Sequence, residues 1–257
     1  MIILKAGDRL PTVAVVQNRL NEHGHSSEFI TVDGIFGPKT KRAIQDFERA
    51  KGLTPDGIVS GHDWNSIVGK QWQVLDSVDV TDFDDPKHAP TDQLDLQPYG
   101  QQLILQYGQC QGIFDVVRTI QSSASAGNVV LLRFHGHGSP GNMIIASGRL
   151  SNRGSSLNSR WGPKFFAFMA GLKGIFAPFG SVEMHGCRVA AGPHGKALIG
   201  GLADALGVPV TAARVTQYGG GGDSTFRFEG AIDTACPGGI SLKAWAQAKC
   251  NQSLVPV

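Results

Sequence analysis

Short apolar runs alternate with amphipathic stretches along residues 101–213, and this alternation restricts the fold more than any other feature. The run "NVVLLRFHGHG" is typical of a buried strand that ends at glycines, and "QQLILQYG", "GSVEMHGC" and "VPVTAA" are further strand candidates. The stretches "GIFDVVRTIQSSASAG" and "GPHGKALIGGLADALG" carry apolar residues at helical spacing. Strands that alternate with helices predict a mostly parallel sheet flanked by helices.

The first 70 residues have a different pattern, which predicts three short helices. The segment "TVAVVQNRLNEHG" is the first, and "GPKTKRAIQDFERAKG" is the second, with Pro38 suited to its first turn and Gly52 to the position just after its end. The third begins at Ser60, and Asp63 lies three residues further on, as in a capping box. The sequence therefore predicts a compact helical unit ahead of the sheet.

We expect an α+β two-domain protein: a small three-helix domain in residues 1–70, an acidic linker or domain edge in 71–100, and an α/β domain in 101–257. Residues 76–100 contain seven Asp, one Lys and three Pro. They lack the fixed ligand offsets of a calcium loop. A solvated linker or the leading edge of the second domain is therefore expected there, and no metal site.

Composition excludes several classes of function. The net charge of the 257 residues is +2, which gives no electrostatic reason to expect nucleic acid as a partner. No apolar run approaches the roughly 18 to 20 residues that span a bilayer. The start, "MIILKAGDRLPTV", lacks the basic region and cleavage site of a standard signal peptide. The protein is therefore cytosolic, exported by another route, or shown here without its signal.

The four cysteines are too scattered for a disulfide framework, and no C-x-x-C pair predicts a thiolate zinc site. A single bridge between Cys236 and Cys250 is left open. The tail that begins with four glycines at 219–222 is expected to be a loop, a strand pair and a short helix.

The helical unit resembles the peptidoglycan-binding module that accompanies many bacterial cell-wall enzymes. The matching segments are "VQNRLNEHG", "VDGIFGPKTKRAIQDFERAKGL" and "DGIVSGHDW", in the order and spacing of that family. The resemblance implies a domain that holds glycan or stem peptide and anchors the chain to murein. The candidate contact residues are Asp33, Gly34, Asp56 and Gly57, although a role in shaping turns is the favoured interpretation for all four.

Two strand ends carry the residues that could perform chemistry. Sites in open parallel sheets gather at the carboxyl ends of the strands, where "HGHG" (135–138) and "HGC" (185–187) both lie. If the two strands are neighbours, an imidazole and the Cys187 thiol come together, and the helix that follows would favour the thiolate. A Cys–His pair can transfer acyl groups, with the N–H groups of Gly138 and Cys187 as oxyanion donors.

The segments "VVLLRFHGHGSPG" and "GSVEMHGCRVAAGPHGKALIGGLADALGVPVTAA" are similar to bacterial caspase-like domains of the caspase–gingipain group. The resemblance covers residues 110–213. It implies that Cys187 is the nucleophile, His137 the base and Gly138 an oxyanion donor. His135 is a supporting partner or the alternative base.

Three alternatives stay open. L,D-transpeptidases carry His-Gly-Cys-x-Arg after such a module, but here "MHGCRV" places arginine directly after the cysteine. A caspase-like domain can also serve as a scaffold without catalysis. A metal site from His135, His137, His185 and Cys187 would lack an acidic ligand at a recognisable offset, so no metal is expected.

The sequence thus predicts a cysteine hydrolase anchored to the cell wall, without a cofactor. Its expected partners are peptidoglycan and a peptide or protein substrate, and its expected location is the cell wall or periplasm, reached by an export route that the sequence does not reveal. The sequence leaves open which bond is cleaved, the side-chain preference, activation by processing and the oligomeric state.

Overall fold

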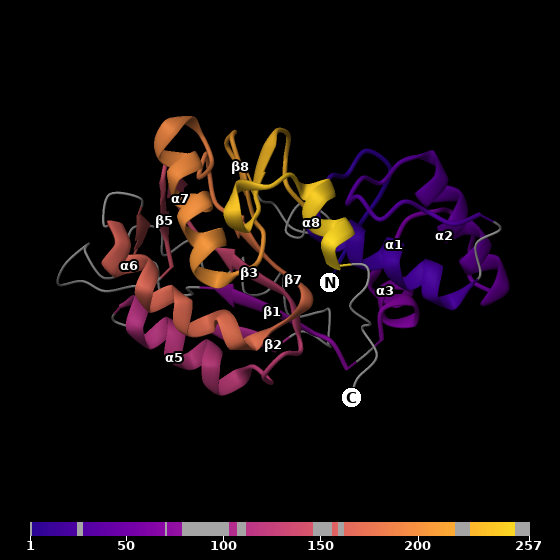
Figure 1. The fold of residues 1–257 in the computed structure, drawn as a ribbon, viewed down its shortest axis with the longest axis horizontal. Coiled ribbons are helices and arrows are strands. Elements are labelled where there is room, and N and C mark those ends of the chain that lie inside the picture. Colours follow the sequence, from indigo (N-terminus) through magenta and orange to yellow (C-terminus); the bar gives the residue numbers. More distant parts are fainter. Residues whose placement is uncertain are drawn as a thin grey trace.

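The computed structural model describes residues 2–24, 28–69, 71–78, 103–106, 112–145, 156–158, 162–218 and 227–249. A helical N-terminal module is followed by an α/β region with a mostly parallel sheet flanked by helices, so the predicted fold class is confirmed (Figure 1).

Glycines and a capping box set the ends of the module's helices. The helices are α1 (Pro11–His23), α2 (Pro38–Ala50) and α3 (Gly61–Ile67). Gly24, at φ 66°, ends α1 in the left-handed conformation, and Gly52, at φ 69°, follows α2. Asp63 accepts the N–H of Ser60 at 2.9 Å and completes a capping box on α3. The three predicted helices are therefore present.

In the described part of the chain the main sheet has six strands in the order β2-β1-β3-β7-β8-β9. Its strands are β1 (Gln73–Val78), β2 (Leu103–Gln106), β3 (Val129–His135), β7 (Phe176–His185), β8 (Val210–Ala213) and β9 (Ile232–Ala235). All neighbouring pairs are parallel except β8 and β9, which are antiparallel. A small antiparallel sheet contains β4 (Gly138–Ser139), β5 (Asn142–Ile144) and β6 (Ser156–Asn158).

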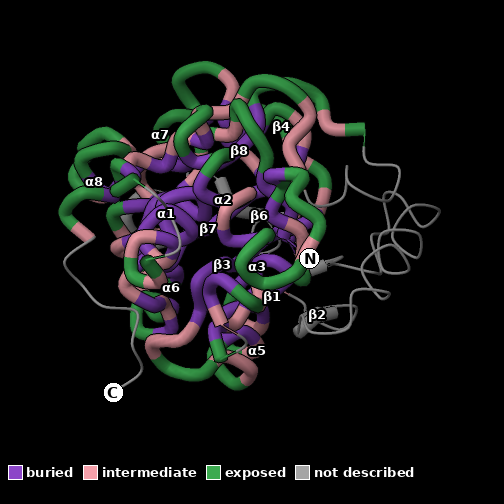
Figure 2. Tube along the Cα trace, turned by 90° about the vertical axis from the view of Figure 1, so that its right-hand side faces the viewer, coloured by how far each residue is buried: buried purple, intermediate pink, exposed green. Residues whose placement is uncertain are grey.

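Helices and the module cover the two faces of the main sheet. The remaining helical elements are α5 (Ile113–Ser123), α6 (Gly162–Met169), the 3₁₀ turn η3 (Ala170–Ile175), α7 (Gly192–Leu206), the 3₁₀ turn η5 (Pro237–Gly239) and α8 (Leu242–Lys249). On one face, Leu132 and Val182 share a core with apolar residues of α5 and α7. On the other, Leu131 and Phe179 share a core with α1, α2, α3 and α8. Every residue of β3 is buried, because both faces are covered (Figure 2).

The module and the sheet are therefore built around a common core. Val13 of α1, Trp72 just before β1, and Trp245 of α8 all belong to it. The chain passes from α3 into β1 within a few residues, and β1 lies between β2 and β3. Within residues 71–100, expected to be an acidic linker or a domain edge, Gln73–Val78 form the strand β1 of the main sheet. Residues 79–100 lie outside the described part.

The described residues include Cys236 and part of the C-terminal tail. Cys236 is a buried free thiol, so the bridge to Cys250 is not formed, and Cys250 itself lies outside the described residues. Of the strand pair and helix expected in the tail, the described residues contain the helix α8 and one strand, β9, which pairs with β8 from before the tail. The glycines at 219–222 lie outside the described residues.

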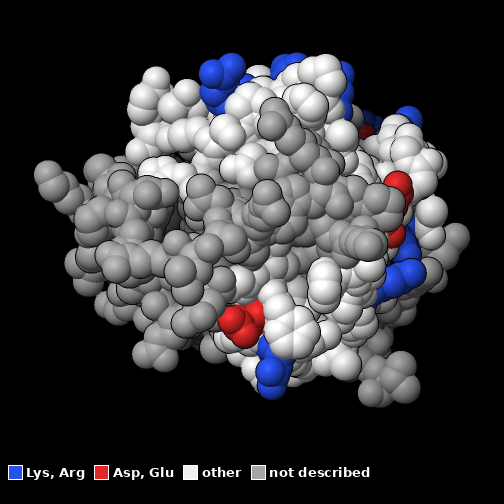
Figure 3. All heavy atoms as spheres, turned by 90° about the vertical axis from the view of Figure 1, so that its left-hand side faces the viewer, with Lys and Arg blue, Asp and Glu red and all other residues white. Residues whose placement is uncertain are grey.

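No helix in the described ranges is long and apolar enough to cross a bilayer. On the face shown in Figure 3, the described Lys, Arg, Asp and Glu side chains are scattered rather than gathered into one basic surface. This agrees with the small net charge.

Candidate functional site

The carboxyl ends of β3 and β7 lie side by side, as the Cys–His hypothesis requires. The two strands are parallel neighbours, and His135 is paired with His185 in their register. Just beyond the strands, the N–H of Gly136 donates to the carbonyl of His185 at 3.4 Å. The expectation that these two strands are adjacent is confirmed.

The "HGHG" loop packs main chain to main chain against the cysteine turn. A Cβ atom on Gly138 would lie 2.8 Å from the carbonyl oxygen of Cys187 and 3.0 Å from its nitrogen. A Cβ atom on Gly186 would lie 3.0 Å from the carbonyl oxygen of Gly136. Only glycine allows backbones to approach this closely. The glycines on both sides of His137 therefore contact the turn that carries the cysteine, and the His137 side chain is exposed.

The sulfur of Cys187 is half-buried beneath the segment that follows β8. The thiol donates to the carbonyl of Gln217 at 3.2 Å, and the N–H of Gln217 donates back to the sulfur at 3.4 Å. The side chain of Gln217 is fixed in turn, because its oxygen accepts the N–H of Glu229 at 2.9 Å and its amide donates to the Glu229 carbonyl at 3.1 Å. A braced main-chain segment therefore covers the candidate nucleophile.

The turn after the cysteine is conformationally strained. Arg188 has a φ of 57° and is the one residue other than glycine with a positive φ in the described part of the chain. Its N–H donates to the carbonyl of Val215 at 2.9 Å, which holds the turn against the covering segment. Non-glycine residues in this region of φ/ψ space often mark functional turns. Helix α7 begins four residues further on, at Gly192.

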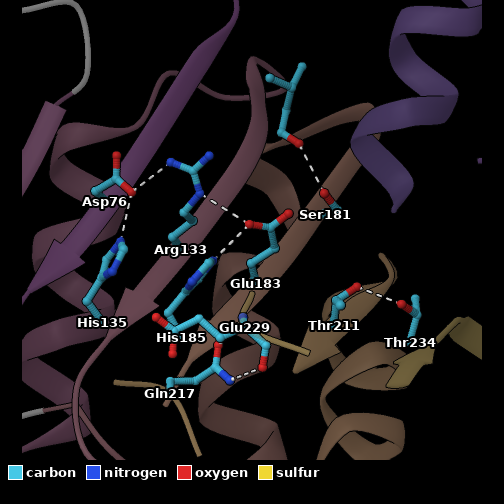
Figure 4. Close-up of polar contacts among 11 residues, drawn as sticks. Asp76, Arg133, His135, Ser181, Glu183, His185, Thr211, Gln217, Glu229 and Thr234 are labelled. Carbon is cyan, nitrogen blue, oxygen red and sulfur yellow. Dashed lines mark hydrogen bonds and ion pairs between the residues drawn. The ribbon is translucent and has the colours of Figure 1, made fainter. Parts of the chain in front are cut away.

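A buried polar network lies on the face of the sheet that the module covers (Figure 4). Arg133 of β3 is its centre, donating to Asp76 of β1 at 3.1 Å and to Glu183 of β7 at 3.2 Å. His135 contacts Asp76 at 3.0 Å, and His185 contacts Glu183 at 3.0 Å. The register explains the arrangement, because Asp76, Arg133 and Glu183 are lateral neighbours on three adjacent strands.

Burial and pairing set the charges of this network. Burial alone would raise the pKa of Asp76, but the Arg133 guanidinium and the hydrogen bond with His135 outweigh it and hold that pKa well below its usual range. Glu183 behaves alike: its hydrogen bond with His185 and the charge of Arg133 overcome burial and lower its pKa. Burial lowers the pKa of His185 to about 4, against the opposing effect of Glu183. His185 is therefore neutral near pH 7.

The two histidines that the sequence left as candidate bases lie in different surroundings. His135 is buried, bonded to Asp76 and stacked on the His185 ring at 5.1 Å between centroids. The His185 ring also stacks on Phe228, with 4.3 Å between the ring centroids. His137 is exposed on the loop that contacts the cysteine turn. The role of His137 as base and that of His135 as supporting partner or alternative base both stay predictions.

The four predicted peptidoglycan contacts shape turns within the module. Asp33 accepts the N–H of Ile35 at 2.9 Å, and Asp56 accepts the N–H of Ile58 at 2.7 Å. The glycine after each aspartate has a positive φ, 74° at Gly34 and 71° at Gly57. These contacts agree with the turn-shaping interpretation, while direct contact with peptidoglycan stays a prediction. Within the described residues, no three His, Cys, Asp or Glu side chains are grouped as a metal site.

Comparison with known proteins identifies the N-terminal module. Residues 9–64 match the family model PG_binding_1, whose description is "Putative peptidoglycan binding domain". A stretch of 36 residues is 58% identical to an uncharacterized protein in the bpoA1 3' region of Kitasatospora aureofaciens. That match covers 14% of this chain and 30% of the relative, so the chain spans less than a third of the relative's length. The chain thus carries a peptidoglycan-binding module.

A second family model covers most of the α/β region. Residues 98–237, more than half of the chain, match the model described as Domain of unknown function (DUF4347). The chain belongs to the DUF4347 family. The matched range of the DUF4347 domain contains Cys187, His137 and the covering segment around Gln217, whereas Asp76 lies between the two matched ranges.

Sequence reasoning missed two groups of residues in the DUF4347 domain and its surroundings. Asp76 and Arg133 form the buried ion pair that holds His135, and Gln217 covers the cysteine. The lone arginine in the apolar run "VVLLRFH" was a signal that could have revealed the ion pair, because a buried charge needs a partner of opposite charge. Gln217 carried no such local signal, since its contact with the sulfur is made by main-chain atoms.

Proposed function

We propose that the protein is a peptidoglycan-anchored cysteine hydrolase in which Cys187 is the nucleophile and His137 moves the protons. The observation that carries the proposal is the close approach of Gly138 to the backbone of Cys187, which places the loop of His137 against the cysteine turn. The strained φ of Arg188 in that turn adds support. The peptidoglycan-binding module supports a location in the cell wall or outside the cell.

In the proposed reaction His137 accepts the thiol proton as the sulfur attacks the carbonyl carbon of a peptide bond. The N–H groups of Gly138 and Cys187 stabilise the oxyanion. The C–N bond breaks, the amine leaves with the proton held by His137, and a thioester remains on Cys187. Water then attacks the thioester with His137 as base, which releases the acid and restores the thiol.

The covering segment sets one condition on this reaction. The main chain of Gln217 engages the sulfur both as acceptor and as donor. A substrate carbonyl must therefore displace Gln217 or bind beside it before the sulfur can attack. The contacts of Gln217 with Glu229 make this displacement a step in which specificity can arise.

A digest of purified sacculi tests the proposal. The intact protein is expected to shorten stem peptides or to cleave peptides from a library, and Cys187→Ala is expected to do neither. Cys236→Ala is the matched control, because burial raises the pKa of the Cys236 thiol to about 11 and keeps it inert. Mass analysis of the muropeptides also separates the alternatives, since new cross-links would indicate an L,D-transpeptidase. Hydrolysis that survives in Cys187→Ala would overturn the proposal, and inactivity of the intact protein on both substrates would favour a scaffold.

Anchoring is tested on the full chain, not on a truncated one. Because the module shares a core with the sheet, removing residues 1–70 would expose an apolar face of the α/β region. Full-length Cys187→Ala is therefore expected to sediment with insoluble peptidoglycan as strongly as the unmodified protein. A protein that stays in the supernatant would contradict the anchoring function.

A further inference from the structure

A cavity of about 440 Å³ lies at the seam between the module and the sheet. Residues 2–12 of the module form one wall, and Arg214 together with the segment 227–232 forms the other. Arg133 and Glu183 of the buried network lie at its floor. Its size is that of a small-molecule site. Neither Cys187 nor His137 lines it, so it is separate from the proposed catalytic turn.

The acidic groups of this seam cavity are already neutralised. Asp8 pairs with Arg227 at 2.6 Å. Glu183 accepts from Arg133 at 3.2 Å and contacts His185 at 3.0 Å. These carboxylates are therefore engaged by protein donors. Which ligand the cavity could bind then depends on the hydrogen-bond donors that have no partner among the described residues.

Two donors at the cavity have no acceptor in the part of the chain that the structure describes. Among those residues, the hydroxyl of Thr12, a fully buried residue, has no hydrogen-bond partner, and neither has the buried Nη1 atom of Arg227. Arg9 adds a positive charge to the wall. Leu10 and Thr12 belong to the start of α1, which has no side-chain cap, so the positive end of a 13-residue helix faces the same space. A hydroxyl, a guanidinium and a helix N-terminus together form the usual surroundings of a bound anion.

We infer that the seam cavity binds a small anionic molecule through a carboxylate or a phosphate group. Arg227 and Thr12 would donate to its oxygens, and Arg9 would supply charge from the wall. Carboxylates of peptidoglycan stem peptides are one source of this chemistry, and a free phosphate or organic acid is the other. Either ligand would contact the module and the α/β region at once.

Calorimetry and thermal unfolding of full-length Cys187→Ala test the inference without turnover. The probes are inorganic phosphate, glutarate and a soluble disaccharide-tetrapeptide, each against sodium chloride of equal ionic strength. At least one probe is expected to bind and to raise Tm. Binding of phosphate or glutarate would identify a free anion as sufficient, whereas binding of the muropeptide alone would identify the wall as the source.

Variants at the cavity distinguish it from other surfaces. Thr12→Val and Arg9→Gln are each expected to weaken binding at least tenfold. Thr12→Val keeps its shape and removes a hydroxyl that has no partner, so the ligand-free Tm is expected to stay equal or rise, which separates lost binding from lost folding. Arg118→Gln on α5 removes the same charge as Arg9→Gln but lies outside the cavity, and is expected to bind normally. The inference is overturned if no probe binds, if Thr12→Val and Arg9→Gln bind as before, or if Arg118→Gln loses binding equally.

Discussion

Asp8, at the edge of the peptidoglycan-binding module, forms a 2.6 Å ion pair with Arg227, two residues before Glu229. Phe228, the next residue, stacks on His185 at 4.3 Å. Glu229 fixes Gln217, whose main chain contacts the sulfur of Cys187. A continuous series of contacts therefore joins the module to the cover of the candidate nucleophile.

The Asp8–Arg227 pair is expected to contribute measurably to stability because both side chains are largely buried, with 13% and 19% exposed. Asp8→Asn and Arg227→Gln should each lower the free energy of unfolding. A double-mutant cycle in urea is expected to give a coupling energy of about 1 to 2 kcal/mol, between the values for exposed and for fully buried pairs. A coupling near zero would show that the contact does not join the two parts energetically.

The sequence predicts those elements of the fold whose cause lies in neighbouring residues. Pro38, Gly52 and Ser60 set helix ends by their own conformational preferences, and the helices were found. The strand that contains Asp76 was not recognised, because its aspartate belongs to an acidic stretch and is neutralised by Arg133, 57 residues further along the chain. The apolar pattern of β3 likewise indicated that something covers each face, but not that the module does so.

The sequence predicted one part of the candidate site, the two strand ends, and not the segment that covers Cys187. The adjacency of the "HGHG" and "HGC" strand ends follows from the parallel sheet, which alternation predicts. The cover over Cys187 could not be predicted, because Gln217 acts through main-chain atoms whose position is fixed by Glu229. Contacts made by backbone atoms leave no mark in residue type.

Glu48 is expected to make stability fall as pH rises. This carboxyl of α2 is fully buried and accepts the N–H of Gly57 at 3.0 Å, and burial raises its pKa from 4.5 to about 7. Between these values the folded protein holds a proton that the unfolded chain has lost, so stability decreases as pH rises from about 4.5 to 7. Glu48→Gln should remove this loss and gain on the order of 2 kcal/mol at pH 8, measured by urea unfolding. Exposed Glu28→Gln is the control, and equal gains in both variants would contradict the assignment.

His185 is expected to make stability fall as pH is lowered. Burial lowers its pKa from 6.5 to about 4, so between these values the unfolded chain holds a proton that the folded protein lacks. Stability therefore falls as pH is lowered from about 6.5 to 4. The effects of Glu48 and His185 oppose each other in the unmodified protein, so Glu48→Gln should show a steeper loss on acidification than the unmodified protein. Adding His185→Gln, which keeps a donor for Glu183, should flatten that slope, and an unchanged slope would exclude His185 as its source.

Gly138 is expected to tolerate no side chain. A Cβ atom there would lie 2.6 Å from a methyl carbon of Val189 and 2.8 Å from the carbonyl oxygen of Cys187. Gly138→Ala should therefore move the loop of His137, reduce hydrolysis at least tenfold and cost about 1 to 3 kcal/mol of stability. Gly174→Ala is the matched control, because nothing lies within 4 Å of a Cβ atom at that position. Full activity in Gly138→Ala would show that the close approach is not needed.

The two histidines of "HGHG" are expected to respond to alanine in different ways. His135→Ala removes one of the two donors to Oδ1 of the buried Asp76, whose Oδ2 has no partner among the described residues, so unfolding should become easier by about 2 to 4 kcal/mol. His135→Gln retains a donor and should recover part of that loss. His137 is exposed, so His137→Ala should leave the free energy of unfolding within about 0.5 kcal/mol while hydrolysis is lost.

Alkylation of Cys187 by iodoacetamide at pH 7 gives a second measurement that needs no known substrate. His137→Ala should slow the reaction several-fold, because the imidazole that accepts the thiol proton is gone. His135→Gln should leave the rate close to that of the unmodified protein. If His135→Gln slowed alkylation and His137→Ala did not, the base would have to be assigned to the buried histidine, and the pairing of His135 with Asp76 would then orient the base instead of only supporting the sheet.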